Sequence, residues 1–559
     1  MKQRLLLFFF AISLAVGTFN YITQTGQKTL PLAPAPPVYK HKILLLPLDS
    51  RPPCQKFVID AGQITGIEVI SPPAEILDYY TQKGDTAALR LWLSENIKNA
   101  DAAILSLDQL IYGGLLAARE NSGDSAAESA AMQFLSELKA ANPQVSLYAF
   151  NILPRIQPPA SIDQYEQRKA LIKTSRLSEE LAIFDNPLDL AEIRQSNEKL
   201  PPATQEKYRN LYKKNTKLNE KLSQMTQQGV LTRLVIGQDD SEDFGIPNME
   251  KQQIQRYLQT ANISADTVTI TRGADEVALS LLTEIQTRIF QIYSPKIHVV
   301  YNDAAAPGRL MPYMSASVAT TVQEKIRLMH GQIVDSPEDA DFILFVHIGT
   351  DKNLAARAQS VKRLQEFLKQ DCKIALVDLS QHFSAEETLL PMLLQYDFPI
   401  NRLIAYAGWN TTSNAVGTAV AQATLFSSEL SQCHNREELL ALYKSNLTFL
   451  NNRYLEDYFY LKDLIDSVNA NLKKAGYTNV YDLDMEHNYR WANDMLQTGM
   501  NKRADYFKHS YAYRQPLAFK TPSGPMQLRI KDLQVEASYP WPRTFEIHLQ
   551  TRLELEELP

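Results

Sequence analysis

The chain has few cysteines and no excess of basic charge. Only three cysteines, Cys54, Cys372 and Cys433, occur in 559 residues, which is far too few for a disulfide-stabilised scaffold. The formal net charge is −6, so the chain has no global basic field that would attract nucleic acid. We therefore expect an ordinary globular protein with no nucleic-acid partner.

Several catalytic motifs are also missing. The histidines form no H-E-x-x-H or H-x-H pattern and none pairs with cysteine at ligand spacing, which argues against a zinc enzyme. No G-x-S-x-G elbow is present, so acyl transfer by a serine triad is poorly supported. Cys54 lacks the local signature of a nucleophile, and a small buried residue is the favoured interpretation. We expect no metal and no cofactor at the functional site.

The N-terminus has the pattern of a secretion signal. Lys2 and Arg4 precede an apolar run, residues 5–16, that ends in small residues near Gly17, as in a signal peptide. If the run is not cleaved, residues 5–22 could instead serve as a short membrane tether. The proline-rich residues 30–37 predict an extended spacer. We expect an extracytoplasmic protein, either secreted or held at the cell envelope.

Beyond the spacer, short apolar runs alternate with stretches of helical periodicity. Strands are predicted at residues 43–48, 67–71, 102–107, 146–152, 233–237, 267–271, 297–302, 341–347, 374–379 and 402–407. Strands separated by helices indicate parallel sheets with helices on both faces. The predicted fold is α/β, with two Rossmann-like parallel-sheet domains, a helical insertion and a C-terminal helical plus small β region.

We expect four segments along the chain. Residues 1–37 form the signal peptide or anchor with its spacer, and residues 38–261 form the first α/β domain. A polar helical insertion at about residues 162–228 is broken in two by Pro201-Pro202. Residues 262–432 form the second α/β domain, where the acidic pair Asp275-Glu276 is favoured as a helix N-terminal cap. Residues 433–559 form a helical region with a C-terminal β segment.

Polar residues gather where the predicted strands end. In open α/β sheets ligands bind outside the carboxyl ends of the strands, so these residues are candidates for one site. In the first cluster, Asp49 and Arg51 either contact a ligand, with Arg51 as a planar fork for a carboxylate or phosphate, or pair with each other. In the second, Asp108-Gln109 and Tyr112 precede Gly113-Gly114, which allow close backbone approach without forming a phosphate-binding motif. A simple strand-to-helix turn is the alternative there.

Two further clusters end strands later in the chain. Asp239 and Asp240 are adjacent acids, suited to a general base, a hydroxyl-binding carboxylate or a hard-cation ligand, and solvated acids of a turn are the alternative. Neighbouring residues in extended chain point opposite ways, so we expect only one of the two to face a site. Trp409 and Asn410 follow the last predicted strand and offer a flat apolar platform and an amide, which suits a sugar. A core tryptophan is the alternative for Trp409.

The clusters together resemble a known family. The motifs that carry the resemblance are Leu46-Pro47-Leu48-Asp49-Ser50-Arg51-Pro52, Asp108-Gln109-Leu110-Ile111-Tyr112-Gly113-Gly114, Gln238-Asp239-Asp240, Gly273-Ala274-Asp275-Glu276, Ala407-Gly408-Trp409-Asn410-Thr411 and Pro540-Trp541-Pro542-Arg543-Thr544-Phe545-Glu546. In these motifs the chain resembles the bacterial domain of unknown function family 4127 over about residues 42–550. The resemblance implies no settled reaction, but it suggests that Arg543 and Glu546 belong with the strand-end clusters.

The leading functional hypothesis is an exported glycoside hydrolase. Carboxylates, aromatic platforms and a secretion signal favour it, and glycosidases need two carboxyl groups across a sugar site. The expected catalytic residues are Asp108, Asp239 and Asp240. The expected substrate-binding residues are Asp49, Arg51, Gln109, Tyr112, Trp409, Asn410, Arg543 and Glu546.

Two alternatives stay open. A non-catalytic sugar- or glycan-binding protein would use the same cleft between two α/β lobes. A metal-assisted phospho- or ester hydrolase would use Asp49, Asp108 and Asp239 as hard oxygen ligands. All three hypotheses expect a carbohydrate or another small molecule as ligand, and the sequence does not fix the oligomeric state.

Overall fold

The computed structural model describes residues 39–121, 125–350, 354–479, 482–521 and 524–558. The predicted signal peptide or anchor and the spacer, residues 1–37, lie outside the described residues. In the described ranges, no helix has both the length and the apolar character that crossing a membrane requires. From His41 onward the chain forms one compact unit.

The first sheet has six parallel strands in the order β2-β1-β3-β4-β5-β6. Its strands are β1 (His41–Leu46), β2 (Ile67–Ile70), β3 (Ala102–Ser106), β4 (Ser146–Leu153), β5 (Arg233–Gln238) and β6 (Val268–Arg272). Its central strands are almost entirely buried, which explains their continuous apolar runs. Because β2 and β3 lie on opposite sides of β1, the strand order reverses there, and such a point is a favoured ligand site.

The second sheet has five parallel strands in the order β11-β10-β9-β7-β8. Its strands are β7 (Lys296–Tyr301), β8 (Gln332–Ile333), β9 (Phe342–Gly349), β10 (Ile374–Ser380) and β11 (Ala405–Ala407). The prediction of two parallel sheets is confirmed. Assigning the strand at residues 267–271 to the second unit was wrong, because β6 pairs with β5 in the first sheet.

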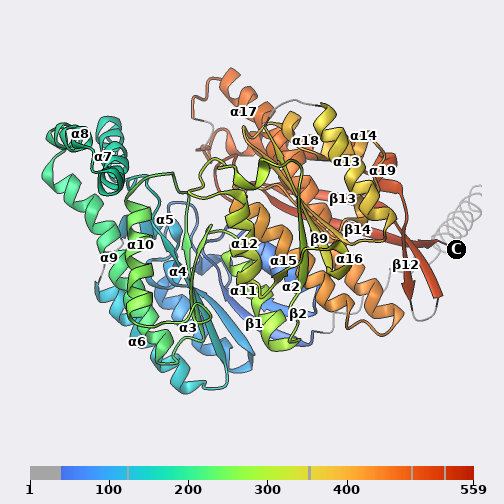
Figure 1. Ribbon diagram of the computed structural model, residues 1–559, viewed down its shortest axis with the longest axis horizontal. Helices are drawn as coiled ribbons and strands as arrows, with labels where there is room; N and C mark the ends of the chain where they lie inside the picture. The colour runs from blue at the N-terminus through green and yellow to red at the C-terminus, as the bar shows by residue number, and fades with distance from the viewer. Residues whose placement is uncertain (1–38, 122–124, 351–353, 480–481, 522–523, 559) are drawn as a thin grey trace, which may run out of the picture. The chain divides into compact units, whose positions relative to one another are not determined.

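Helices flank the first sheet, and three of them form the insertion. The flanking helices are α2 (Lys56–Gly62), α3 (Thr86–Asn96), α4 (Leu107–Tyr112), α5 (Leu115–Asn121), α6 (Ser125–Ala141) and α10 (Ile246–Thr260). The insertion contains α7 (Tyr165–Phe184), α8 (Pro187–Glu198) and α9 (Pro202–Gln227), and Figure 1 shows α7 and α8 projecting to one side. The prediction of a single break, at Pro201-Pro202, was wrong, because the insertion also breaks between α7 and α8. The backbone of Asp185 adopts the left-handed conformation, Asn186 caps α8, and Pro187 is its first residue.

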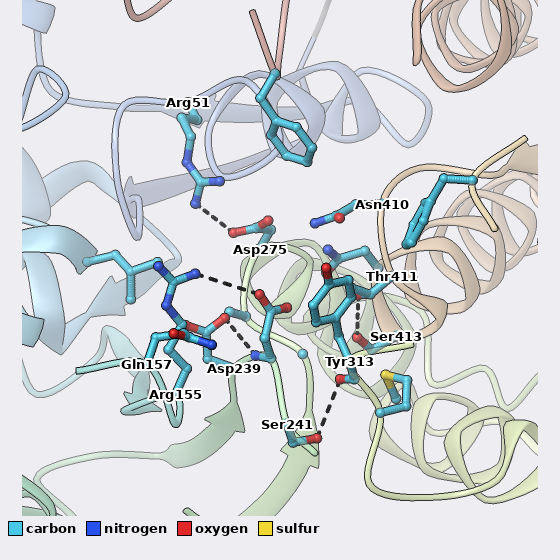
Figure 2. A pocket seen from close by; sticks show the side chains of 18 of the residues that line it. Arg51, Arg155, Gln157, Asp239, Ser241, Asp275, Tyr313, Asn410, Thr411 and Ser413 are labelled. Carbon is cyan, nitrogen blue, oxygen red and sulfur yellow. Dashed lines mark hydrogen bonds and ion pairs between the residues drawn. The ribbon is translucent and has the colours of Figure 1, made fainter. Parts of the chain in front are cut away.

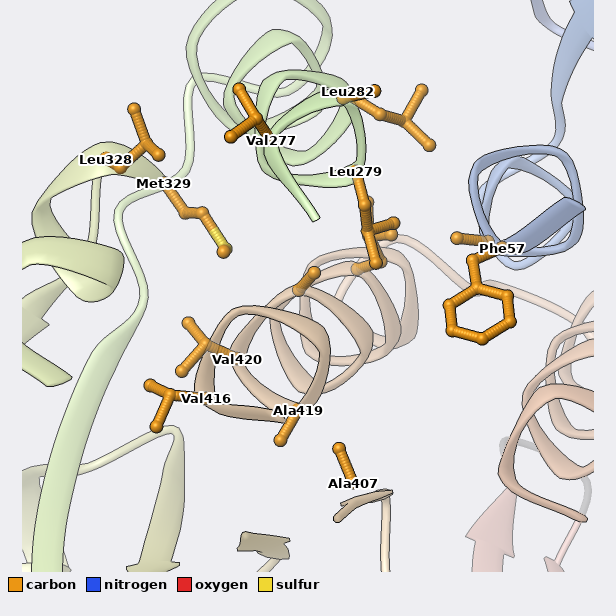
Figure 3. Packing of buried hydrophobic residues seen from close by; sticks show 14 of the residues in the cluster. Phe57, Val277, Leu279, Leu282, Leu328, Met329, Ala407, Val416, Ala419 and Val420 are labelled. Atoms are coloured by element: carbon orange, nitrogen blue, oxygen red, sulfur yellow. The ribbon is translucent and has the colours of Figure 1, made fainter. Parts of the chain in front are cut away.

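A buried helix joins the two sheets. Nearly every residue of α15 (Thr412–Leu430) is buried, which is typical of a helix with neighbours on all sides. In Figure 3, Val416 and Val420 of α15 lie near Val277 of α11 (Val277–Ile285) and Met329, which follows α12 (Val318–Leu328). The same apolar cluster includes strand residues from both sheets, among them Phe150 and Leu344. One continuous core therefore fixes the two sheets with respect to each other.

The last part of the chain is helical and ends in a three-stranded antiparallel sheet, as predicted. Its strands are β12 (Leu517–Thr521), β13 (Gly524–Ser538) and β14 (His548–Leu558). Its helices are α16 (Arg436–Arg453), the π-helical η8 (Tyr454–Leu464), α17 (Ile465–Lys474), α18 (Tyr489–His509) and α19 (Tyr511–Arg514); α13 (Leu354–Lys369) and α14 (Leu390–Gln395) precede them beside the second sheet. Lys462 of η8 lines the cavity described next.

Candidate active site

Loops from the carboxyl ends of both sheets meet at one cavity of about 660 Å³. The first sheet supplies the segments that follow β1, β4, β5 and β6, and the second sheet supplies those that follow β7, β10 and β11. Residues of α5, of η8 and α17, and of the C-terminal segment at 541–545 complete the wall. Three strand-end clusters and the C-terminal motif thus converge, although they are hundreds of residues apart in sequence.

The predicted site residues divide between the cavity wall and the interior. Those that line the cavity are Asp49, Arg51, Asp239, Asp240, Asn410 and Arg543. Those that do not line it are Asp108, Gln109, Tyr112, Trp409 and Glu546.

Arg51 links the first strand end to the loop after β6. Its Nη2 donates to Asp49 Oδ2 at 2.6 Å and to Asp275 Oδ1 at 2.7 Å, while its Nε donates to Asp49 Oδ1 at 2.9 Å. All three side chains are nearly buried. Burial raises the pKa of Asp275 to about 6 against the opposing effect of Arg51. Asp275 lines the cavity. Of the pair expected to cap a helix, Glu276 occupies the N-cap position of α11 but its side chain makes no capping hydrogen bond, and Asp275 precedes that position, so a capping role for either side chain was wrong.

A neighbouring group of three side chains bears on the metal hypothesis. Asp49, Cys54 and Asp275 place one ligand atom each within 4.8 Å of one another. However, the Arg51 guanidinium already binds both carboxylates, so a cation there would have to displace it. In the described part of the chain, Asp49, Asp108 and Asp239 form no such group. The donor set therefore suits an arginine better than a metal ion.

Asp239 and Asp240 directly follow β5 and lie in two different environments. Asp239 forms an ion pair with Arg119 of α5 and accepts the Asp240 N–H at 2.8 Å. Burial opposes ionisation of Asp239, but Arg119 and then Arg155 hold its pKa below the usual range. Burial and the neighbouring Asp239 raise the pKa of Asp240 to about 7. Its nearest cation is Arg155, whose Nη1 lies 3.7 Å from Asp240 Oδ2.

The opposite wall comes from the second sheet. Figure 2 shows Asn410, Thr411 and Ser413 facing the side of the cavity that carries Arg155 and Asp239. The Ser241 N–H donates to the Tyr313 carbonyl at 3.0 Å, which ties the loop after β5 to the loop after β7. Tyr313, Phe383 and Asn410 all have φ between 54° and 63°. Such left-handed non-glycine residues concentrate at functional sites, where surrounding contacts hold them.

Aromatic side chains surround part of the cavity. Tyr313 and Phe383 are 53% and 38% exposed, and their ring centroids lie 6.3 Å apart. Trp541 donates its indole N–H to Ser50 Oγ at 2.9 Å, and the Arg543 guanidinium lies 4.9 Å from its ring centroid. Tyr313 and Phe383 supply the exposed apolar surface that was expected from Trp409, whereas Trp541 is 1% exposed and lies at the back of the wall.

Trp409 belongs to the core, so its expected role as a platform was wrong. It is 1% exposed and packs against Phe57 of α2 and Phe545, with ring centroids 6.4 Å and 6.2 Å away. Its neighbour Asn410 reaches the cavity instead. The Gly408 N–H donates to Asp457 of η8 at 2.9 Å, which fixes the start of this turn.

The cluster after β3 also lies in the interior. Asp108 is 2% exposed because α4 begins at Leu107 and places Asp108 in its first turn. Its Oδ2 accepts the backbone N–H of Ile152 at 3.0 Å, and burial raises its pKa to about 7. Gln109 is fully buried, and the Tyr112 hydroxyl donates to Glu128 at 3.0 Å. The expected contacts of Asp108, Gln109 and Tyr112 with substrate are therefore corrected: these residues support the fold behind the cavity.

Glu546 acts on the site through Arg543. The Arg543 Nε and Nη2 atoms donate to the two Glu546 oxygens at 2.8 Å and 2.7 Å. Glu546 is fully buried, whereas Arg543 lines the cavity. Glu546 therefore orients Arg543 and does not itself reach a ligand.

Several wall residues were absent from the predicted site. They are Arg119, Arg155, Asp275, Tyr313, Phe383, Lys462 and Trp541. Asp275 and Trp541 occur in the motifs of the family resemblance, and those motifs were the available signal for them. Arg119 lies in a helix and Arg155 follows a strand without an acidic neighbour, so no local pattern distinguishes them.

Fold and site together define an α/β protein with a polar, aromatic-rimmed cavity at the carboxyl ends of two parallel sheets. Residues 43–550 match a family described as protein of unknown function (DUF4127), and the chain belongs to this family. No curated protein and no solved structure matches the chain.

Proposed function

We propose that this protein is a glycoside hydrolase that uses Asp239 and Asp240 as its carboxylate pair. The single observation that carries the proposal is that two carboxyl groups of one cavity lie in different surroundings: Asp239 is ion-paired with Arg119, whereas the nearest cation to Asp240 is 3.7 Å away, and their pKa values are displaced in opposite directions accordingly. Glycosidases need one carboxyl group that keeps its proton and one that stays ionised. The sequence predicted a catalytic pair made of Asp108 and one of these two residues. Because Asp108 is buried and does not line the cavity, we propose the pair Asp239 and Asp240 instead.

Asp240 is the proposed general acid. Burial and the adjacent carboxylate raise its pKa to about 7, so that near neutral pH it can donate a proton to a leaving oxygen and recover it afterwards. Its side chain is 36% exposed and lines the cavity, which leaves it accessible to a ligand.

Asp239 is the proposed ionised partner. Arg119 and the Asp240 N–H neutralise part of its charge and fix its orientation. A carboxylate held in this way stabilises positive charge that develops at a sugar ring, and it either attacks the ring directly or acts as the base for an attacking water. Stereochemistry distinguishes these roles, because attack gives a retaining enzyme whereas base-assisted attack by water gives inversion.

The rest of the cavity suits a sugar. Asn410 and Ser413 offer hydroxyl-binding groups, and the exposed rings of Tyr313 and Phe383 offer apolar faces. The Arg51 bridge between Asp49 and Asp275 keeps this part of the wall rigid. We further propose, from the N-terminal sequence pattern, that the enzyme acts outside the cytoplasm.

The test is turnover of a panel of glycans and aryl glycosides by the full-length protein, with and without a chelator. We expect cleavage that persists in chelator and falls by at least about 100-fold in Asp240→Asn, since general acid catalysis contributes roughly 10²- to 10⁴-fold. The exposed Asp266→Asn variant is the matched control and should keep full activity. Ligand binding without turnover would instead assign the protein to the sugar-binding class, and loss of activity in chelator would favour a metal-assisted hydrolase.

A further inference from the structure

Two arginines at one end of the cavity lie close enough to repel each other. Arg119 is the largest cause of the lowered pKa of Arg155, which falls to about 10, and Arg543 adds to the effect. Like charges in a buried site are costly unless opposite charges balance them. We therefore asked which carboxylates balance the positive charges of these arginines.

The three arginines differ in how closely a carboxylate pairs with each of them. Arg119 has Asp239, and Arg543 has Glu546 in a two-point contact. The nearest carboxylate to Arg155 is that of Asp240, with 3.7 Å between the nearest atoms, which is longer than a hydrogen bond, while Asp239 acts on Arg155 at longer range. Among the described residues, the buried Nε atoms of Arg119 and Arg155 have no hydrogen-bond partner. Buried donors of this kind normally have partners, so the hydrogen-bonding capacity of these two guanidinium groups is not used up by the protein.

The proposed chemistry makes the imbalance larger. When Asp240 carries a proton, as a general acid must before the reaction, Arg155 has no anionic partner within 4 Å in the described part of the chain. Figure 2 shows Arg155 beside Gln157 at the edge of the space that Asp239 faces. A guanidinium so placed can bind a carboxylate, sulfate or phosphate through two parallel hydrogen bonds.

We propose that Arg155, together with Arg119, forms a subsite for an anionic group of the ligand, so that the cavity selects acidic sugars over their neutral counterparts. The anion subsite refines the proposed glycosidase function. It rests on that function only for identifying the rest of the ligand as a sugar. Arg155 is then a specificity-determining residue: it contacts the charged substituent, while Asp239 and Asp240 act at the glycosidic bond. Arg119 has a double role, because it also keeps Asp239 ionised.

Binding of matched ligand pairs tests the subsite. Calorimetry on full-length Asp240→Asn would compare methyl glucuronide with methyl glucoside, methyl galacturonide with methyl galactoside, and glucose 6-sulfate and 6-phosphate with glucose. We expect at least one acidic member to bind about 10- to 100-fold more tightly than its neutral counterpart, the range that charge-assisted hydrogen bonds contribute. The carboxylate, sulfate and phosphate arms identify which anion the subsite takes.

Substitutions in the same background complete the test. Adding Arg155→Gln should abolish the preference while leaving affinity for the neutral member unchanged, and Arg155→Lys should restore part of it. Arg194→Gln, at an exposed position on α8, is the matched control and should change neither affinity. Equal affinity within every pair, or a preference that survives Arg155→Gln, would overturn the subsite.

This experiment separates the two proposals. Acidic sugars that bind at Arg155, with no cleavage by the unsubstituted protein of any glycoside in the panel, acidic or neutral, would leave the subsite standing and refute the glycosidase. Cleavage of neutral glycosides with no acidic preference would leave the glycosidase standing and refute the subsite.

Discussion

Replacing Asp108 by asparagine should stabilise the protein at neutral and alkaline pH. Burial raises the pKa of Asp108 from 3.8 to about 7, so the folded protein binds this proton more tightly than the unfolded chain does. The contribution to stability is fully present below about pH 4 and is lost as the pH rises through about 7. A displacement of roughly 3 units corresponds to at most about 4 kcal/mol.

Asparagine keeps the geometry while removing the charge. Its Oδ1 can still accept the Ile152 N–H that Asp108 accepts at 3.0 Å, and its volume is nearly the same. We therefore expect the free energy of unfolding of Asp108→Asn to match the unsubstituted protein near pH 4. At pH 8 it should exceed that of the unsubstituted protein by up to about 4 kcal/mol.

Denaturant unfolding at pH 4, 6 and 8 measures this difference, with Asp266→Asn as the exposed control. The same variants should be assayed for turnover, because Asp108 does not line the cavity and its loss should leave activity within a few-fold. An Asp108→Asn variant with unchanged pH dependence of stability and abolished turnover would refute this reasoning and return Asp108 to the catalytic site.

Three further predictions follow from other parts of the structure. Turnover should decline as the pH rises through about 7, because Asp240 then loses the proton that a general acid must donate; a rate that still increases above pH 8 would contradict that role. Lys325→Met should destabilise the fold by about 3 to 5 kcal/mol, since it leaves Glu276, 2.5 Å from Lys325 Nζ and 2% exposed, as an uncompensated buried charge. Chemical denaturation checks this, and Glu276→Gln added to Lys325→Met should recover most of the loss. Tyr313→Ala should weaken sugar binding about 5- to 50-fold with a nearly unchanged melting temperature, because the ring is half exposed at the cavity mouth; Tyr396→Ala, similarly exposed but outside the cavity, is the calorimetric control.

The sequence predicted the secondary structure well because apolar runs and amphipathic periods are local signals. The larger strands lie within about three residues of their predicted positions. The short β8 was not predicted, since two exposed residues carry no periodic pattern. The pairing of β6 with the first sheet was also missed, because the order of strands along the chain does not say which edge a strand joins.

The candidate site could be predicted only in part, because long-range partners decide which strand-end side chains turn inward. Asp49 and Arg51 reach the cavity as expected, since carboxyl ends of parallel strands share an edge. Asp239 and Asp240 both line it, so the expectation that only one of these neighbours would face a site was wrong: they lie in the loop after β5, where the alternation of an extended strand no longer applies. Trp409 turns into the core because Phe57 and Phe545 enclose it, and neither is near it in sequence.

The turn after β6 shows how one glycine redirects a pair of acids. Gly273 has φ +97°, and a Cβ there would lie 2.0 Å from Glu276 Oε1. This turn sends Asp275 to Arg51, 224 residues away, and Glu276 to the buried Lys325. A local capping preference could not reveal either partner.

The most direct test of whether Asp239 and Asp240 form the catalytic pair is an assay of aryl glycoside cleavage. It measures the rate and the anomeric outcome for the full-length protein and for its Asp239→Asn and Asp240→Asn variants. The carboxylate-pair mechanism predicts cleavage with a single anomeric outcome. It also predicts that Asp240→Asn keeps more activity toward aryl leaving groups that need no protonation than toward unactivated glycans, whereas Asp239→Asn loses both. Full turnover in both variants would contradict the account.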